Sequence, residues 1–84
     1  METRVAVIAI VVEDFTQVGE LNHILHEYGQ YIIGRMGIPY EKRKISLISV
    51  AMDAPSDVIS AMNGKIGMLK GVTSKAAYSK LPEE

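Results

Sequence analysis

Two histidines, His23 and His26, have the residue type and spacing that come nearest to a metal site in this chain. Residues three apart on a helix are neighbours, so both imidazoles project from one side. Glu20 and Glu27 flank them, and imidazole with carboxylate can hold zinc, nickel or iron. Two such ligands are too few for a tight site unless a neighbouring subunit contributes others. The simpler interpretation is a pair of solvated or salt-bridged histidines.

A second candidate site is the segment Gly34 to Gly37, GRMG. Glycine weakens a strand, so two of them indicate a bulge or the close approach of another backbone or a ligand. Arg35 lies between them, and its guanidinium can bind a carboxylate or phosphate through two parallel hydrogen bonds. We place Arg35 and Gly37 in a predicted ligand-binding site. A kinked edge strand with an exposed arginine is the competing interpretation.

Catalytic chemistry has little support in the sequence. The serines have no histidine at an interpretable spacing, the carboxylates are scattered, and cysteine is absent. Lys42 to Lys44 form a basic run, but no aromatic residues are interleaved for stacking on bases, so we assign it to a solvated hairpin tip. We therefore expect no enzyme, no catalytic residues and no direct contact with nucleic acid. The sequence identifies no cofactor.

Alternating strands and helices must position these residues. Four short apolar or β-branched runs predict strands, at residues 5–12, 31–36, 45–52 and 72–78. Apolar residues at helical spacing predict helices over 18–28 and from about 56 to 69. Asp14 or Thr16 is expected to cap the first helix, and Gly29 to end it. Residues 37–39 should bend or end the second strand.

The order β-α-β-β-α-β predicts an α+β, ferredoxin-like sandwich, in which two helices cover one face of a four-stranded antiparallel sheet. With 84 residues and no internal repeat, the chain is expected to form a single domain, 1–84. A net charge of −1 gives no attraction to nucleic acid or anionic lipid. The longest apolar run, 5–12, is far below the ~20 residues of a membrane helix. We expect a cytoplasmic protein without membrane contact.

The predicted strands at 5–12 and 45–52 are apolar on both faces. Two helices can cover only one face of the sheet, and large apolar patches rarely stay in water. The simplest cover is another copy of the chain. We therefore predict a homo-oligomer, either a dimer or a dimer of dimers.

Residues 14–24 resemble the loop-to-helix junction of an ACT domain, which reads Gly-x-Leu-x-x-Ile and here begins at Gly19. ACT domains share the predicted order of elements and usually bind small effectors where two copies meet. The glycine admits a ligand close to the backbone at a helix N-terminus. The resemblance implies a ligand-binding site that includes Asp14, Val18, Gly19 and Leu21.

A closer resemblance extends over nearly the whole chain, to a small family of iron-only hydrogenase system regulators with an ACT-like fold. It is carried by five segments: 10–14 (IVVED), 26–29 (HEYG), 33–39 (IGRMGIP), 64–67 (GKIG) and 70–72 (KGV). It implies a regulatory role, with transcription regulation among the expected processes. This family resembles the effector domain of the nickel-responsive repressor.

The likeness to that repressor makes a specific test of metal binding possible. Aligning His26-Glu27 with the repressor's His-Glu places His26 on its first nickel ligand. The other three ligands fall on Gly37, Pro39 and Ile45, none of which can replace them. The sequence therefore argues against the repressor's square-planar nickel site. Residues 1–4 are also too few for its DNA-binding ribbon.

The leading hypothesis is a small ligand-responsive regulator that changes its assembly when an effector binds near Asp14–Leu21, with Arg35 supplying charge. A separate DNA-binding or hydrogenase-related protein would read that state. One alternative is a metal-binding accessory protein that uses His23 and His26 across a subunit interface. The other is a pure assembly module with no ligand.

Overall fold

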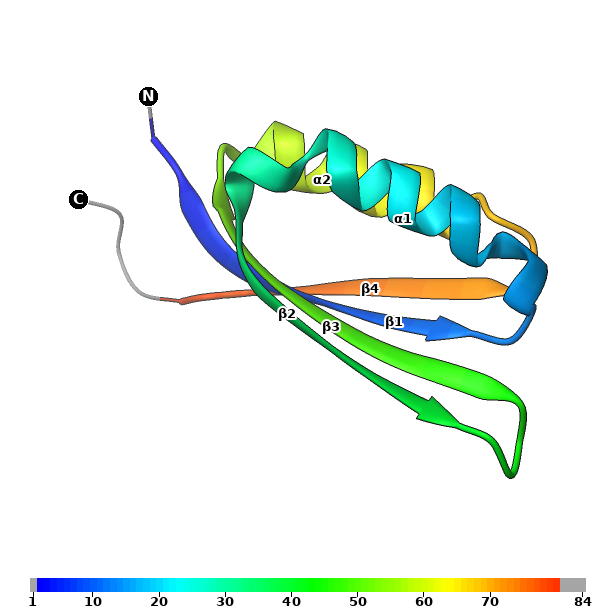
Figure 1. Ribbon diagram of the computed structural model, residues 1–84. Helices are drawn as coiled ribbons and strands as arrows, with labels where there is room; N and C mark the ends of the chain where they lie inside the picture. The colour runs from blue at the N-terminus through cyan, green and yellow to red at the C-terminus, as the bar shows by residue number, and fades with distance from the viewer. Residues whose placement is uncertain (1, 81–84) are drawn as a thin grey trace.

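A computed structural model describes residues 2–80 of the chain. The strands and helices, in order, are β1 (Arg4–Val12), α1 (Val18–Glu27), β2 (Ile32–Tyr40), β3 (Ile45–Ala54), α2 (Ser56–Gly67) and β4 (Val72–Tyr78). Single 3-10 turns, η1 (Phe15–Gln17) and η2 (Gly29–Tyr31), flank α1. The strands form one antiparallel sheet in the order β2-β3-β1-β4, and both helices lie on one face of it (Figure 1). The predicted ferredoxin-like fold is confirmed.

The core lies between the helices and the sheet. Alternate residues of β1, namely Ala6, Ile8, Ile10 and Val12, are almost completely buried under the helices. Each helix contributes three buried apolar residues to the same cluster, Leu21, Ile24 and Leu25 from α1 and Ile59, Met62 and Ile66 from α2. These are residues that the helical spacing selected, so the apolar faces of both helices were predicted correctly.

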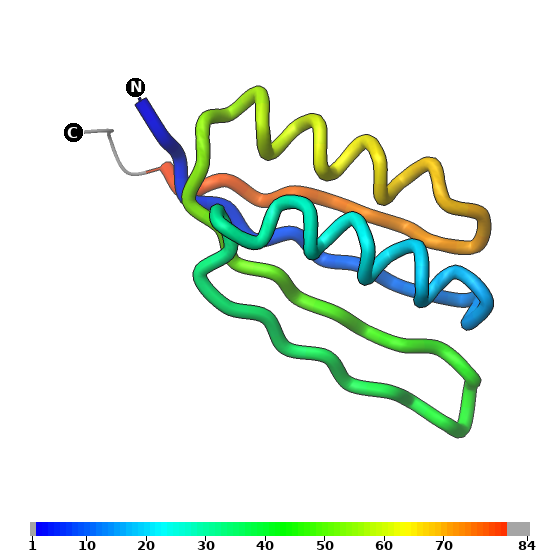
Figure 2. Tube along the Cα trace, turned by 45° about the horizontal axis from the view of Figure 1, so that its top comes forward, coloured from blue at the N-terminus to red at the C-terminus, as the bar shows by residue number. Residues whose placement is uncertain are grey.

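Strand β2 differs from the prediction because it does not end near Met36. Its pairing with β3 continues to Tyr40, which lies opposite Ile45. Pro39 lacks an N–H donor, but β2 is an edge strand, where the missing donor can be tolerated. Figure 2 shows β2 as the outermost strand, beyond the helices, and all of its residues except Ile32 are exposed.

A bulge in β2 decides which of its side chains face the helices. The pairing shifts between Ile32 and Gly34, so that Ile33 is an extra residue beside one of the two glycines that indicated a bulge. One extra residue reverses the alternation of side chains from that point onward. The side chains that point away from the helices are therefore Met36, Ile38 and Tyr40, and those on the helix side are Arg35 and Pro39.

Glycine acts differently in the helices from what the sequence suggested. Helix α1 ends at Glu27, and Gly29 begins the following 3-10 turn without a positive φ. Helix α2 contains Gly64 in its interior and ends at Gly67, close to the predicted end near residue 69. A Cβ added at either α2 glycine meets nothing within 4 Å, so neither marks close packing within this chain. Among residues 2–80, no helix is long and apolar enough to cross a membrane.

Candidate functional site

The sheet has one face that the helices leave uncovered, here called the open face. It consists of the odd-numbered residues of β1 (5–11), β3 (45–53) and β4 (73–77), together with the even-numbered residues of β2 (34–40). Most of these side chains are apolar, and several are large and well exposed, with 42% of Val7 and 62% of Met36 accessible to solvent. An apolar face of this extent is typical of an interaction surface.

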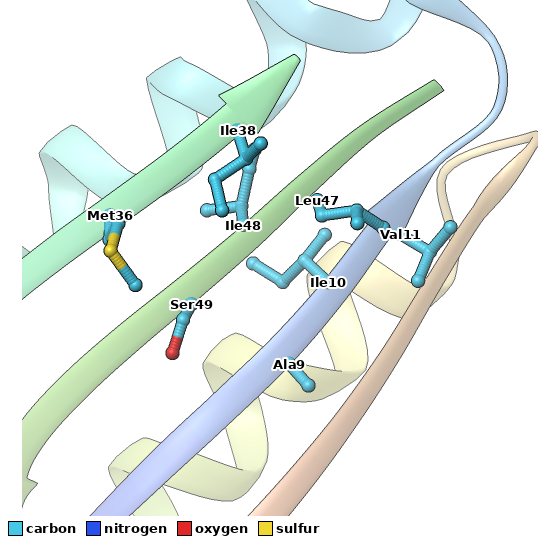
Figure 3. Close-up of a pocket in the computed structure, with 8 residues that line it drawn as sticks. All are labelled: Ala9, Ile10, Val11, Met36, Ile38, Leu47, Ile48 and Ser49. Atoms are coloured by element: carbon cyan, nitrogen blue, oxygen red, sulfur yellow. The ribbon is translucent and has the colours of Figure 1, made fainter. Parts of the chain in front are cut away.

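A shallow hollow of about 180 Å³ lies on the open face where β1, β3 and β2 run side by side. Figure 3 shows the side chains around it, and those that belong to the open face are Ala9, Val11, Met36, Ile38, Leu47 and Ser49. Typical small-molecule sites occupy about 300–1,000 Å³ and enclose most of their ligand. This hollow is smaller and open, so it suits an inserted side chain better than an enclosed metabolite.

The junction between β1 and α1 is the second candidate site, and a local turn shapes it. The Asp14 carboxylate accepts hydrogen bonds from the Thr16 backbone N–H at 3.0 Å and from the Thr16 hydroxyl at 2.6 Å. These bonds, assisted by the positive charge of Lys70, lower the pKa of Asp14 below its ordinary value of 3.8. Asp14 thus caps the turn η1 rather than the first turn of α1.

Gly71, in the turn between α2 and β4, holds this junction from the other side. Its carbonyl oxygen accepts a hydrogen bond of 2.7 Å from the Glu13 backbone N–H. Its φ is +73°, and an added Cβ would lie 2.7 Å from the Cβ of Asp14. Only glycine fits there without displacement. The sequence marked Lys70-Gly71 as a turn, but nothing in it indicated that this turn supports the junction.

The structure separates the predicted ligand-binding residues of the junction. Val18 and Gly19 lie in the first turn of α1, where Val18 is half-buried and Gly19 is exposed. Leu21 is fully buried in the core, so its side chain does not line the surface of the junction. The surface that a ligand can reach here consists of the Asp14 turn and the exposed backbone at Gly19.

Arg35 lies on the helix side of β2 and contacts α1. One of its guanidinium nitrogens, Nη2, donates a hydrogen bond of 3.3 Å to Oδ1 of Asn22. Gly37 follows two residues along the same side of the strand, with Ile48 as its near neighbour. No pattern in the sequence indicates the contact with Asn22, because thirteen positions and a change of element separate the two residues.

His23 and His26 are both exposed on the outer side of α1, as the apolar spacing predicted. Residues 2–80 contain no group of three or more His, Cys, Asp or Glu side chains that could hold a metal ion. The flanking Glu27 instead lies 3.6 Å from the ammonium group of Lys65 on α2. A metal bound by these histidines would therefore need further ligands from outside residues 2–80 of this chain.

The basic run from Lys42 to Lys44 forms the tip of the β2–β3 hairpin. Backbone hydrogen bonds from Arg43 to Tyr40 and from Lys44 to Glu41 close the turn. Lys44 adopts a positive φ of 56°. All three basic side chains are exposed, as expected for a solvated hairpin tip.

Residues 4–76 match a family described as "TM1266-like: Iron-only hydrogenase system regulator, putative". The chain belongs to the TM1266-like family. A similar solved structure is that of the uncharacterised protein TM1266 from Thermotoga maritima, with a TM-score of 0.90 and 29% sequence identity. The alignment covers 94% of this chain and 100% of that one. No curated protein matches the chain.

The predicted family is therefore confirmed, and the match spans both candidate sites. The matched range runs from the start of β1 to within β4, so it includes the Asp14 junction and nearly all of the open face. The TM1266-like family is described as regulatory, which agrees with the expectation of a protein that is not an enzyme.

Proposed function

We propose that this chain is a regulatory protein of the iron-only hydrogenase system that works as a homo-oligomer and responds to a small effector. The observation that carries the proposal is the open face, an exposed apolar sheet surface in a family described as regulatory. Such a surface gives a regulator a means of assembly. Assembly in turn gives an effector an equilibrium to shift.

The effector site of this proposal lies between Arg35 and the β1–α1 junction. A guanidinium carries five N–H donors, and Arg35 gives one of them to Asn22. Its remaining donors and its exposure allow it to hold a carboxylate or phosphate group. The Asp14 carboxylate is already engaged by Thr16, so its role is to shape the junction. We therefore propose an anionic effector.

Regulation then follows from differential binding. An effector that binds one assembly state more tightly than another increases the population of that state, by no more than the difference between its two affinities. A separate DNA-binding or hydrogenase-related protein reads that state. Coupling of this kind typically amounts to about 1–3 kcal/mol, which is sufficient for a 5- to 150-fold change.

Thermal unfolding in the presence of amino acids, mononucleotides and divalent metals tests the proposal. An effector at about 100 times its Kd adds roughly 2.7 kcal/mol of stability, which corresponds to a rise in Tm on the order of 10 °C for a chain of this size. Arg35→Met should abolish the rise, whereas Arg43→Met at the hairpin tip, a matched control, should leave it intact. A flat response to every compound would favour an assembly module without a ligand.

A metal-binding accessory role is the second candidate, because His23 and His26 are both exposed and one helical turn apart on α1. Titration calorimetry with nickel, zinc and iron on the native chain and on His26→Ala separates this role from the first. Heat that is saturable and lost in His26→Ala supports it. The absence of metal-dependent heat in the native chain excludes it.

A further inference from the structure

The open face carries two charged strand residues, and they have opposite signs. Asp53 near the end of β3 lies opposite Val5, and Lys75 of β4 lies opposite Ala9. Both side chains are exposed. They are separated by one strand across the sheet and by four residues along it, which amounts to roughly 16 Å.

Opposite charges at two separated points make the face complementary to itself. In an interface with two-fold symmetry, each residue of one copy meets a residue of the other, and the reverse contact follows automatically. A pair of like charges would repel when the same face is stacked on itself. Here a two-fold axis that lies in the interface plane, passes over β1 near Val7 and is perpendicular to the line joining Lys75 and Asp53 brings Lys75 of each copy toward Asp53 of the other. The apolar residues between them are then buried.

The size of the open face fits this arrangement. Four strands spaced about 4.8 Å apart and rising about 3.3 Å per residue give a flat footprint of roughly 500 Å². Side chains that project from it raise the accessible area toward the ~800 Å² that each partner contributes to a stable interface. A second copy has the matching area and the matching charges. A lipid surface fits poorly, because Lys75 is the single cation on the strands of this face.

We infer that the open face is covered by the open face of a second copy, with Lys75 of each copy paired to Asp53 of the other. The inference rests on the proposed function only in assuming a homo-oligomer. It adds the face-to-face arrangement of the two open faces and the contact that fixes their orientation.

A charge placed in the middle of the open face tests the surface. Val7→Glu should reduce the mass measured by light scattering at micromolar concentration, to the 9.2 kDa of one chain if this is the only interface. Ala61→Glu adds the same charge at an exposed position on the outer side of α2 and should leave the mass unchanged. Circular dichroism checks that both variants are folded. A native chain that is monomeric, or a folded Val7→Glu variant that keeps the native mass, overturns the inference.

A charge exchange tests the pair and does not depend on Val7→Glu folding. Lys75→Glu gives each copy two acidic residues on the face, Asp53→Lys gives it two basic residues, and each should raise the dissociation constant about tenfold. The double variant exchanges the charges and should return to within about twofold of the native constant. A double variant that is as weak as the two changes combined overturns the pairing.

These results are distinguishable from a failure of the proposed function. A native oligomer whose mass ignores every change on the open face refutes the inference and leaves the regulatory proposal standing with another interface. An oligomer that depends on the open face but shows no response to any effector refutes ligand control and supports the inference.

Discussion

The two faces of the sheet consist of the same kinds of residue, but one face is buried under the helices and the other is exposed. Ile8 points toward the helices and is 0% exposed, whereas its neighbour Val7 points the other way and is 42% exposed. Both are β-branched, and both belong to the same central strand. Composition therefore does not decide which face becomes the core of this chain. The helices decide it, because two of them can cover only one face, and the other face is left apolar and exposed.

The largest expected effect comes from truncating one residue on each face. Ile8→Ala removes buried atoms and leaves a cavity, so it should lower the free energy of unfolding by about 2–5 kcal/mol. Val7→Ala should cost less than about 1 kcal/mol in an isolated chain, because its side chain is already partly in water. Urea unfolding at low protein concentration measures both.

Protein concentration then provides the control for the two variants Ile8→Ala and Val7→Ala. If a second copy covers the open face, unfolding is linked to dissociation, and the cost of Val7→Ala grows as the concentration rises. The cost of Ile8→Ala should be nearly independent of concentration. Equal costs for the two variants at low concentration would mean that the two faces do not differ as described.

The contrast between the faces also shows what the sequence can and cannot reveal. Alternation along β1 and the helical spacing of Leu21, Ile24 and Leu25 follow from local periodicity, so the fold and the core could be predicted. The orientation of Arg35 could not, because it depends on one extra residue, Ile33, that reverses the alternation of β2. A glycine beside the bulge indicates an irregularity but not its register.

The candidate sites were predictable to different degrees. The resemblance predicts a ligand-binding site at the junction near Asp14, a prediction that rests on the resemblance alone. The support of this junction by Gly71 joins two positions that are far apart in the sequence. Leu21 shows a second limit of motif-based prediction. It belongs to the motif that marks the junction, but its side chain is buried and anchors the helix in the core. The open face was predicted from strands that are apolar on both sides, since that pattern requires two covers.

A smaller effect is expected at Gly71, in the turn between α2 and β4 that supports the Asp14 junction. Gly71→Ala forces a Cβ into a left-handed conformation, at about 1–2 kcal/mol, and against the Cβ of Asp14 at 2.7 Å. We expect a loss of roughly 2 kcal/mol in thermal or urea unfolding. Gly29→Ala is the matched control, because its added Cβ meets nothing within 4 Å, and it should change stability by less than about 0.5 kcal/mol. Similar losses in both would refute the special role of Gly71.

Gly64 provides a test of the outer surface of the helices. It lies within α2 with open space around it, so Gly64→Ala should stabilise the protein by about 0.5–1 kcal/mol through helix propensity. The reverse change at the exposed Ala61 of the same helix should destabilise by a similar amount. Neither should alter the mass in light scattering. A change in mass with Gly64→Ala would place an interface on the helices and weaken the contrast between the two faces.

The smallest expected effect is a pH dependence at the Asp14 turn, which joins the two layers. Hydrogen bonds from Thr16 lower the pKa of the folded Asp14 below its ordinary value of 3.8, so its ionised form contributes stability above that pH. This contribution is lost as the pH falls through the lowered pKa. Asp14→Asn keeps an oxygen that accepts hydrogen bonds but cannot titrate. The Tm of the native chain should therefore exceed that of Asp14→Asn at neutral pH, and the gap should close on acidification below 3.8. Glu41→Gln at the hairpin tip serves as the control. A difference in Tm between the native chain and Asp14→Asn that stays constant with pH would show that the carboxylate charge does not stabilise the turn.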